Sequence, residues 1–169
     1  MPYISVIIPA FNEEKYIIPT LEALLKQTFR DYEIIVVANG CTDTTEQILK
    51  AQISEKLRHL SLPQANVSVA RNAGALNAQG DILAFVDADT QLAENSLQKI
   101  KEEFTSEYSV ATTKAAPNLQ NWKFQMHQMT KNILHKSHFY QGCSGVLICR
   151  KKDFHAVDGY PPTIVVKEH

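Results

Sequence analysis

Residues 82–90 read ILAFVDADT, an apolar run that ends in two aspartates separated by one residue. A short apolar run of this length is typical of a strand buried on both faces of a sheet. Because side chains alternate along a strand, we expect Asp87 and Asp89 to point the same way and Ala88 the other way. Two carboxylates that close repel each other unless a cation or a proton compensates. The stretch therefore predicts a buried strand that ends in a polar site.

A hard divalent cation suits this pair of carboxylates. Mg²⁺ and Mn²⁺ prefer oxygen ligands and often bind one or two carboxylates together with substrate phosphates and water. No Cys or His stands beside the pair, which argues against zinc. The alternative is that one aspartate caps the following turn and the other is solvated, and the spacing alone does not decide between them.

Strand-like and helix-like segments alternate along the rest of the chain. Pro19 fits a first turn or a kink better than a helix interior, and Ser68 is a candidate helix cap. The alternation predicts an α/β fold with a mostly parallel central sheet flanked by helices. The expected strands are 3–8, 32–38, 60–62, 81–86, 110–116 and 146–149. The expected helices are 14–27, 42 or 43 to about 57, 66–79, 93–104, 121–140 and 151–157.

Polar residues follow three of the expected strands, in segments 9–13, 38–42 and 87–89. In open parallel sheets, ligands bind beyond the carboxyl ends of the strands. Three such segments on one edge of a sheet predict a binding site there more strongly than any one of them alone.

Bulk composition narrows the classes of function. The chain has 169 residues, 44% of them hydrophobic, which fits one globular domain. Its 17 basic and 18 acidic residues give a net charge of −1, which argues against a nucleic-acid partner. Three cysteines without a CxxC pair indicate free thiols in a reducing compartment. Without a signal-like start or a span-length apolar run, we expect a soluble, cytoplasmic protein, with a peripheral membrane contact left open.

Four motifs follow one another along the chain: SVIIPAFNEE (5–14), EIIVVANGCTDTT (33–45), VARNAGALNAQGDILAFVDADT (69–90) and QGCSGVLICRKKDFHAVDGYP (141–161). Together and in this order they resemble a family 2 glycosyltransferase with the GT-A fold, and the resemblance covers nearly the whole chain. The resemblance implies a nucleotide-diphosphate-sugar donor, favouring a UDP-sugar, and transfer with inversion to an unidentified saccharide or lipid-linked acceptor. It also implies a role in cell-envelope polysaccharide synthesis and leaves a homodimer open.

The same resemblance implies roles for individual residues. Asp87 and Asp89 would be the ligands of Mn²⁺ or Mg²⁺, with Asp89 holding the metal that bridges the diphosphate and acting in catalysis. Glu168 would be the general base, although a tail without a role is an equal alternative and His169 is another candidate. The residues implied in nucleotide-sugar binding are Pro9, Ala10, Phe11, Glu13, Asn39, Arg71, Gly74, Asp87 and Ala88.

The chain also departs from the family pattern. Ala38 and Asn39 stand where the family has an acidic pair, and Cys41 replaces a serine, so selectivity for uracil stays open.

The chain is short for the family, and we expect one GT-A-like domain over 1–169, with a nucleotide-binding half at about 1–90 and a partial acceptor-side half at about 91–169. The alternative is a non-catalytic nucleotide-sugar-binding module or a fragment of a larger transferase. No glycine- and lysine-rich phosphate loop or GxGxxG follows the first strand, which disfavours a nucleotidyltransferase and a dinucleotide oxidoreductase.

Overall fold

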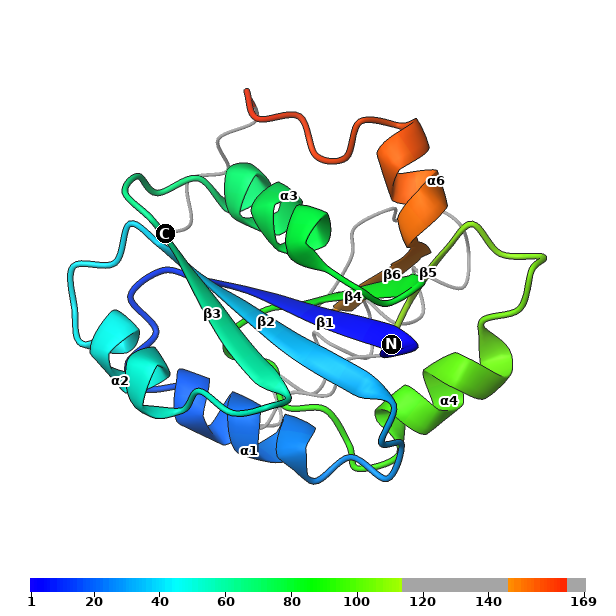
Figure 1. The fold of residues 1–169 in the computed structure, drawn as a ribbon, viewed down its shortest axis with the longest axis horizontal. Helices are drawn as coiled ribbons and strands as arrows, with labels where there is room; N and C mark the ends of the chain where they lie inside the picture. The colour runs from blue at the N-terminus through cyan, green and yellow to red at the C-terminus, as the bar shows by residue number, and fades with distance from the viewer. Residues whose placement is uncertain (114–145, 164–169) are drawn as a thin grey trace, which may run out of the picture.

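A computed structural model of the chain describes residues 1–113 and 146–163. These residues contain a six-stranded sheet in the order β3-β2-β1-β4-β6-β5 (Figure 1). The strands are β1 (Ile4–Ala10), β2 (Tyr32–Asn39), β3 (Leu57–Leu62), β4 (Ile82–Val86), β5 (Val110–Thr112) and β6 (Val146–Arg150). The helices are α1 (Ile17–Leu25), α2 (Thr45–Ala51), α3 (Val67–Asn77), α4 (Ser96–Glu103) and α6 (Lys151–Ala156).

The sheet is parallel from β3 to β4 and antiparallel beyond it. β1 pairs in parallel with β2 and β4, and β2 pairs in parallel with β3. β6 runs antiparallel to both β4 and β5. Each parallel pair needs a crossover connection, and a helix supplies it. The expectation of an α/β fold with a mostly parallel sheet is confirmed.

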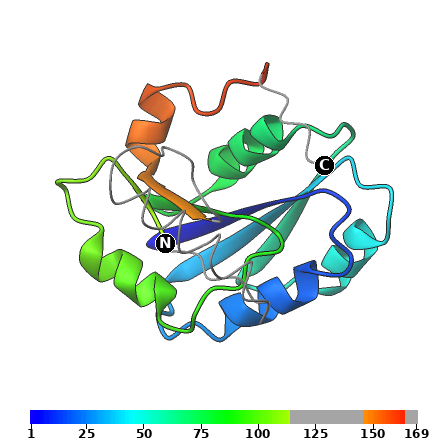
Figure 2. The same cartoon turned by 180° about the vertical axis from the view of Figure 1, so that it is seen from behind.

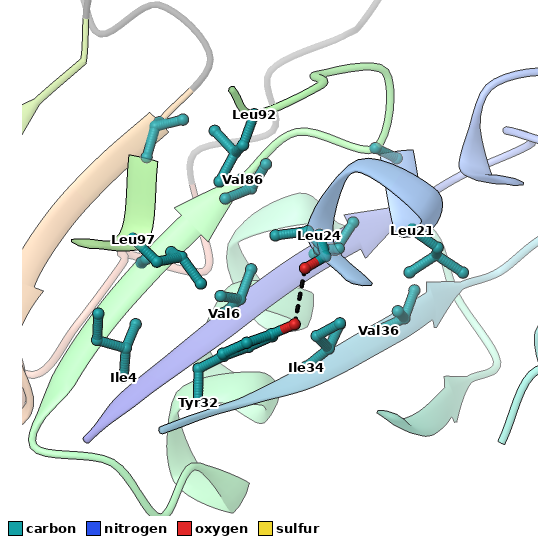
Figure 3. Close-up of a cluster of buried hydrophobic side chains, with 14 of the residues drawn as sticks. Ile4, Val6, Leu21, Leu24, Tyr32, Ile34, Val36, Val86, Leu92 and Leu97 are labelled. Atoms are coloured by element: carbon teal, nitrogen blue, oxygen red, sulfur yellow. Dashed lines mark hydrogen bonds between the residues drawn. The ribbon is translucent and has the colours of Figure 1, made fainter. Parts of the chain in front are cut away.

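Helices cover both faces of the sheet, with α1, α2 and α4 on one face and α3 and α6 on the other (Figures 1 and 2). Alternate residues of β1 therefore enter different cores: Val6 packs in the cluster under α1 and α4, and Ile7 in the cluster under α3. Figure 3 shows the first cluster, in which the Tyr32 hydroxyl donates a 2.7 Å hydrogen bond to the Leu24 carbonyl. Burial on both faces explains why β1 and β2 read as continuous apolar runs.

Two of the expected boundaries are wrong. The second helix ends at Ala51 and not near residue 57, because Leu57 is buried and begins β3 beside Ile34 of β2. The cap of α3 is Asn66, whose Oδ1 accepts a hydrogen bond from the Val69 N–H at 3.1 Å, and Ser68 lies inside the first turn. The expected helix at 121–140 lies outside the described residues. The strand expected at 110–116 is β5, which ends at Thr112, and residues 114–116 lie outside the described part of the chain.

Helix α3 lies close to the sheet at Gly74. A Cβ on this residue would come within 2.4 Å of Ile7 Cγ2, so the contact between α3 and β1 requires glycine. Pro19 falls in the first turn of α1, as expected, where its missing N–H costs no helical hydrogen bond.

A buried carboxylate ties the connection between α3 and β4 to the sheet. Glu33 Oε1 accepts hydrogen bonds from Ser5 Oγ at 2.7 Å and from the Gln79 N–H at 2.6 Å. Its other oxygen lies 2.5 Å from Arg58 Nη2. Burial alone would raise the pKa of Glu33, but these hydrogen bonds and the Arg58 charge outweigh it and lower the pKa. The network holds the chain where β4 begins.

In the described part of the chain, no helix combines the length and the apolar composition needed to cross a bilayer.

Candidate functional site

A pocket of about 320 Å³ lies at the carboxyl ends of β1, β2 and β4. This is the edge at which the three polar segments of the sequence were expected to meet, and each of them contributes to the pocket wall. One residue of the wall, Val67 at the start of α3, was not anticipated from the sequence. The lining residues are Pro9, Phe11, Glu13, Asn39, Val67, Asp87, Ala88 and Asp89.

The paired aspartates lie in a turn just beyond β4. The strand ends at Val86, and the Thr90 N–H donates to the Asp87 carbonyl at 3.0 Å. Ala88 is buried between the two aspartates, and its carbonyl accepts a 2.7 Å hydrogen bond from Thr20 Oγ1 on α1. Side-chain alternation along a strand therefore does not apply to this pair. The turn nevertheless brings both carboxylates to the same pocket.

The two carboxylates have different surroundings. Arg71 Nη2 lies 3.0 Å from Asp87 Oδ1, in an ion pair in which the Asp87 side chain is 46% exposed. Desolvation raises the pKa of Asp87, the Arg71 charge and hydrogen bond lower it without cancelling that rise, and the Asp89 charge raises it further. Asp89 is exposed, and its Oδ1 has a long 3.5 Å contact with Thr90 Oγ1. Asp89 is thus the more open carboxylate for a ligand.

The donor atoms fit a divalent cation that arrives with a phosphate ligand. Across residues 1–113 and 146–163, no group of three or more His, Cys, Asp or Glu side chains is placed to hold a metal ion. Two carboxylates are few for a site made of protein atoms alone, but Mg²⁺ commonly takes one or two carboxylates and completes its shell with phosphates and water. Asp87 and Asp89 are the residues that would hold such an ion.

Asn39 presents a hydrogen-bond donor to the opposite side of the pocket. Its Oδ1 accepts the Asn66 backbone N–H at 2.7 Å, which fixes the orientation of the amide. Asn39 is only 3% exposed and lines the pocket. Because its oxygen is held by Asn66, the amide nitrogen is the group of this side chain that could serve a ligand as a hydrogen-bond donor.

The loop after β1 is anchored to the loop after β2. Asn12 has a φ of 56°, a left-handed conformation that asparagine tolerates. Its Oδ1 accepts the Thr42 N–H at 2.8 Å, which joins the two loops beside the pocket. Phe11, 40% exposed, is held by this loop at the pocket wall. Asn12 was not among the site residues expected from the sequence, although asparagine after a strand is a known signal for a turn.

Not every residue singled out from the sequence lines the pocket. Ala10 is fully buried beneath it, and its carbonyl accepts a hydrogen bond from Cys41 Sγ at 3.2 Å. Arg71 reaches the pocket through Asp87, and Gly74 faces Ile7 of the sheet. Glu168 lies outside the described residues. The roles of these residues remain predictions.

Comparison with known proteins identifies the family. The family model described as "Glycosyl transferase family 2" matches residues 5–155, and the chain belongs to this family. Among its relatives, the putative teichuronic acid biosynthesis glycosyltransferase TuaG of Bacillus subtilis is 35% identical over 113 residues, which cover 65% of this chain and 44% of TuaG.

Solved structures show the same fold. The crystal structure of S. aureus TarS 1-349 in complex with UDP is 23% identical with a TM-score of 0.71, and the match covers 98% of this chain and 52% of that one. The mannosyltransferase PcManGT from Pyrobaculum calidifontis, in complex with GDP-Man and Mn²⁺, is 19% identical with a TM-score of 0.79, over 96% of this chain and 48% of that one. The expected GT-A fold is confirmed.

The match covers only part of the relatives. The chain spans 14%, 30% and 34% of the length of the first three curated relatives that it matches.

Proposed function

We propose that this chain forms the donor-binding part of a glycosyltransferase that moves a sugar from a nucleoside-diphosphate donor to an acceptor, with inversion and with a divalent metal. The observation that carries the proposal is the pocket at the carboxyl edge of the sheet, which has paired carboxylates on one side and a fixed amide donor on the other. A nucleotide sugar has the matching pair of groups, a charged diphosphate and a hydrogen-bonding base.

The strand order supports one orientation of the donor. Asp87 and Asp89 follow β4, Asn39 ends β2, and β1 lies between these strands. Neighbouring strands lie about 4.8 Å apart, so the two sides of the pocket are separated by roughly 10 Å. An extended nucleotide can span this gap with its diphosphate at the aspartates and its base at Asn39 and Phe11. Pro9, Glu13, Ala88 and Val67 would line the space between them.

The metal, Mn²⁺ or Mg²⁺, would stabilise the negative charge that develops on the departing diphosphate. In this proposal Asp89 holds the ion from the open side of the pocket. Asp87 lies beside it with its position fixed by Arg71. An inverting transfer also needs a base to take the proton of the acceptor hydroxyl, and Glu168 remains the candidate for that role.

The donor and acceptor are proposed by class. We favour a UDP-sugar donor and a saccharide or lipid-linked acceptor of the cell envelope. The complex of TarS with UDP supports the donor, and the description of TuaG as a putative teichuronic acid biosynthesis glycosyltransferase supports the acceptor. GDP-Man in PcManGT shows that a protein of this fold also binds a guanine nucleotide. We place the reaction in the cytoplasm, with a peripheral membrane contact where the acceptor is lipid-linked.

A non-catalytic nucleotide-sugar-binding module is the second candidate, because Ala38 and Asn39 stand where the family has an acidic pair. Both functions share the donor site and differ in turnover.

Isothermal titration with UDP, GDP, CDP and TDP, each with and without Mn²⁺, tests the shared donor site. We expect one nucleotide to bind at least about tenfold more tightly with the metal, since the two carboxylates would otherwise repel the diphosphate. Absence of binding by every nucleotide, with the protein folded, would contradict both functions. Release of the sugar or its transfer from the matching nucleotide sugar then separates the transferase from the binding module.

A further inference from the structure

A short segment after α6, residues 159–163 with the sequence GYPPT, lies along α3 (Figures 1 and 2). We call it the strap. Asn72 on α3 binds both backbone polar groups of Tyr160, donating from Nδ2 to the carbonyl at 2.8 Å and accepting the N–H on Oδ1 at 2.9 Å. Farther along, Asn66 Nδ2 donates to the Pro162 carbonyl at 3.0 Å. Two asparagine side chains of one helix thus hold the strap in place.

The backbone at the start of the strap is shaped to meet Asn72. Gly159 has a φ of 67°, which favours glycine. A Cβ at this position would lie 2.7 Å from Asn72 Oδ1 and 2.8 Å from the Phe154 ring. The chain can therefore present the Tyr160 backbone to Asn72 only because residue 159 has no side chain.

The Tyr160 side chain contacts Arg71, the residue that pairs with Asp87 of the pocket. Its ring packs edge-on against Phe85 of β4, with centroids 5.4 Å apart and planes at 88°. Arg71 Cζ lies 5.2 Å from the same ring centroid. Arg71 in turn holds Asp87, with Nη2 3.0 Å from Oδ1. The guanidinium therefore contacts an aromatic ring as well as the carboxylate of the pocket.

Within the described residues, the Asp87 carboxylate and the Tyr160 ring are the contacts that orient the Arg71 guanidinium. The Arg71 Nε is buried and has no hydrogen-bond partner among the described residues. A guanidinium near an aromatic face is attracted to the ring, and this attraction grows when water is excluded. Loss of the ring would let Arg71 leave the geometry in which it fixes Asp87.

We infer that Tyr160, held by Asn72, is a positioning residue for the Arg71–Asp87 pair, so that the strap sets the orientation of Asp87 toward the metal-bound nucleotide. This inference rests on the proposed function. It makes nucleotide binding depend on a segment that contributes no residue to the lining of the pocket.

The test is a double-mutant cycle on nucleotide affinity in the presence of Mn²⁺, with the nucleotide that the wild type binds best. We expect Tyr160→Leu to weaken binding about threefold to tenfold, the range of a partly desolvated cation–ring contact. Tyr160→Phe keeps the ring and should bind like the wild type. Asn72→Ala frees the strap without changing the ring and should weaken binding in the same direction. In an Arg71→Ala background, Tyr160→Leu should have no further effect.

Tyr3→Leu is the matched control, because Lys101 Nζ lies 4.5 Å from the Tyr3 ring at the other end of the sheet. This variant also loses a cation–ring contact and should keep its nucleotide affinity. Unchanged affinity in Tyr160→Leu, or an equal loss in the presence and absence of Arg71, would overturn the inference while nucleotide binding by the wild type still supports the donor site. A wild type that binds no nucleotide would overturn the donor site and the inference together.

Discussion

Asn39 offers the pocket a donor where an acidic residue would offer an acceptor. The amide orientation follows from one contact, because a backbone N–H can donate only to the Asn39 oxygen. A base next to Asn39 must therefore present an acceptor, such as a carbonyl oxygen or an unprotonated ring nitrogen. The substitution of an amide for a carboxylate thus changes the chemistry of recognition and leaves the hydrogen bond to Asn66 intact.

Asn39→Asp should shift the preference between uridine and cytidine nucleotides toward the base that the wild type disfavours. The aspartate can still accept the Asn66 N–H while its second oxygen replaces the donor with an acceptor. Uracil and cytosine present opposite hydrogen-bonding groups at positions 3 and 4, so the base favoured by an amide is disfavoured by a carboxylate. We expect the ratio of the UDP and CDP dissociation constants, measured by titration with Mn²⁺, to change by about tenfold.

Asn77→Asp is the control for this substitution, because Asn77 is exposed at the end of α3 and donates to the Ala73 carbonyl. It adds the same charge without touching the pocket. A ratio that moves equally in both variants, or in neither, would show that Asn39 does not read the base.

At the level of single residues, the sequence predicted which residues lie at the site, but it did not predict their hydrogen-bond partners. Asp87 and Asn39 could be placed because each follows a clear apolar strand, and the ends of parallel strands share an edge. The donor direction of Asn39 could not be predicted, because it depends on Asn66, which is 27 residues away. The ion pair between Arg71 and Asp87 could not be predicted either, since it joins a helix to a turn.

At the level of elements, Glu33 links β2 to the chain that enters β4. The folded state lowers its pKa, so its ionised form favours folding. This contribution is complete above the unfolded-state pKa of about 4.5 and is lost as the pH falls through the lower folded-state value. Acid should therefore weaken this network before it affects the apolar core.

Glu33→Gln should lower the free energy of unfolding at pH 7 by about 1–3 kcal/mol, because its amide cannot accept from Arg58 as the carboxylate does. The difference from the wild type should shrink as the pH falls below about 4.5 and through the lower folded-state pKa of Glu33, where the wild type loses the charge. Urea unfolding across this pH range measures both effects. Glu55→Gln, at an exposed position, should change little. A deficit that keeps its full size from pH 7 down to the acid unfolding of the wild type would show that the charge of Glu33 does not stabilise the fold.

Gly74→Ala should destabilise the fold by about 1–3 kcal/mol, although alanine normally stabilises a helix interior relative to glycine. The reason is the 2.4 Å approach of the added Cβ to Ile7 Cγ2, on a stiff β-branched side chain. Thermal or urea unfolding gives the sign directly. Leu76→Ala, at a 75% exposed position of the same helix, should stay within about 0.5 kcal/mol. Greater stability of the Gly74 variant would contradict the close contact between α3 and β1.

Periodicity predicted the types of these elements more reliably than their ends. The helical pattern of α2 ran on toward residue 57 because the local sequence contains no proline or glycine to stop it. The sheet decides the boundary instead, since Leu57 gains a ladder partner in β2 and a buried position. The boundary between α2 and β3 therefore depends on contacts between distant segments, and the local sequence pattern does not predict it.

At the level of the whole molecule, the two layers of helices and the sheet between them leave the polar side chains of the site at one edge of the sheet. Burial on both faces leaves β1, β2 and β4 few positions for polar side chains, so polar groups collect where the strands end. The alternation of strands and helices was enough to predict this edge from the sequence. The antiparallel addition of β6 and the strap along α3 were not predictable in the same way, because their partners lie far away in the chain.

The most direct test of the donor site is the change in melting temperature caused by the best-binding nucleoside diphosphate with Mn²⁺, in the wild type, Asp89→Asn and Asp81→Asn. Asp81 is an exposed aspartate at the opposite end of β4 and serves as the matched control. At 100 times its dissociation constant, a ligand stabilises the native state by about 2.7 kcal/mol, a shift of several degrees. We predict this shift in the wild type and Asp81→Asn and its loss in Asp89→Asn. An equal shift in all three proteins would contradict a metal–diphosphate site at Asp89.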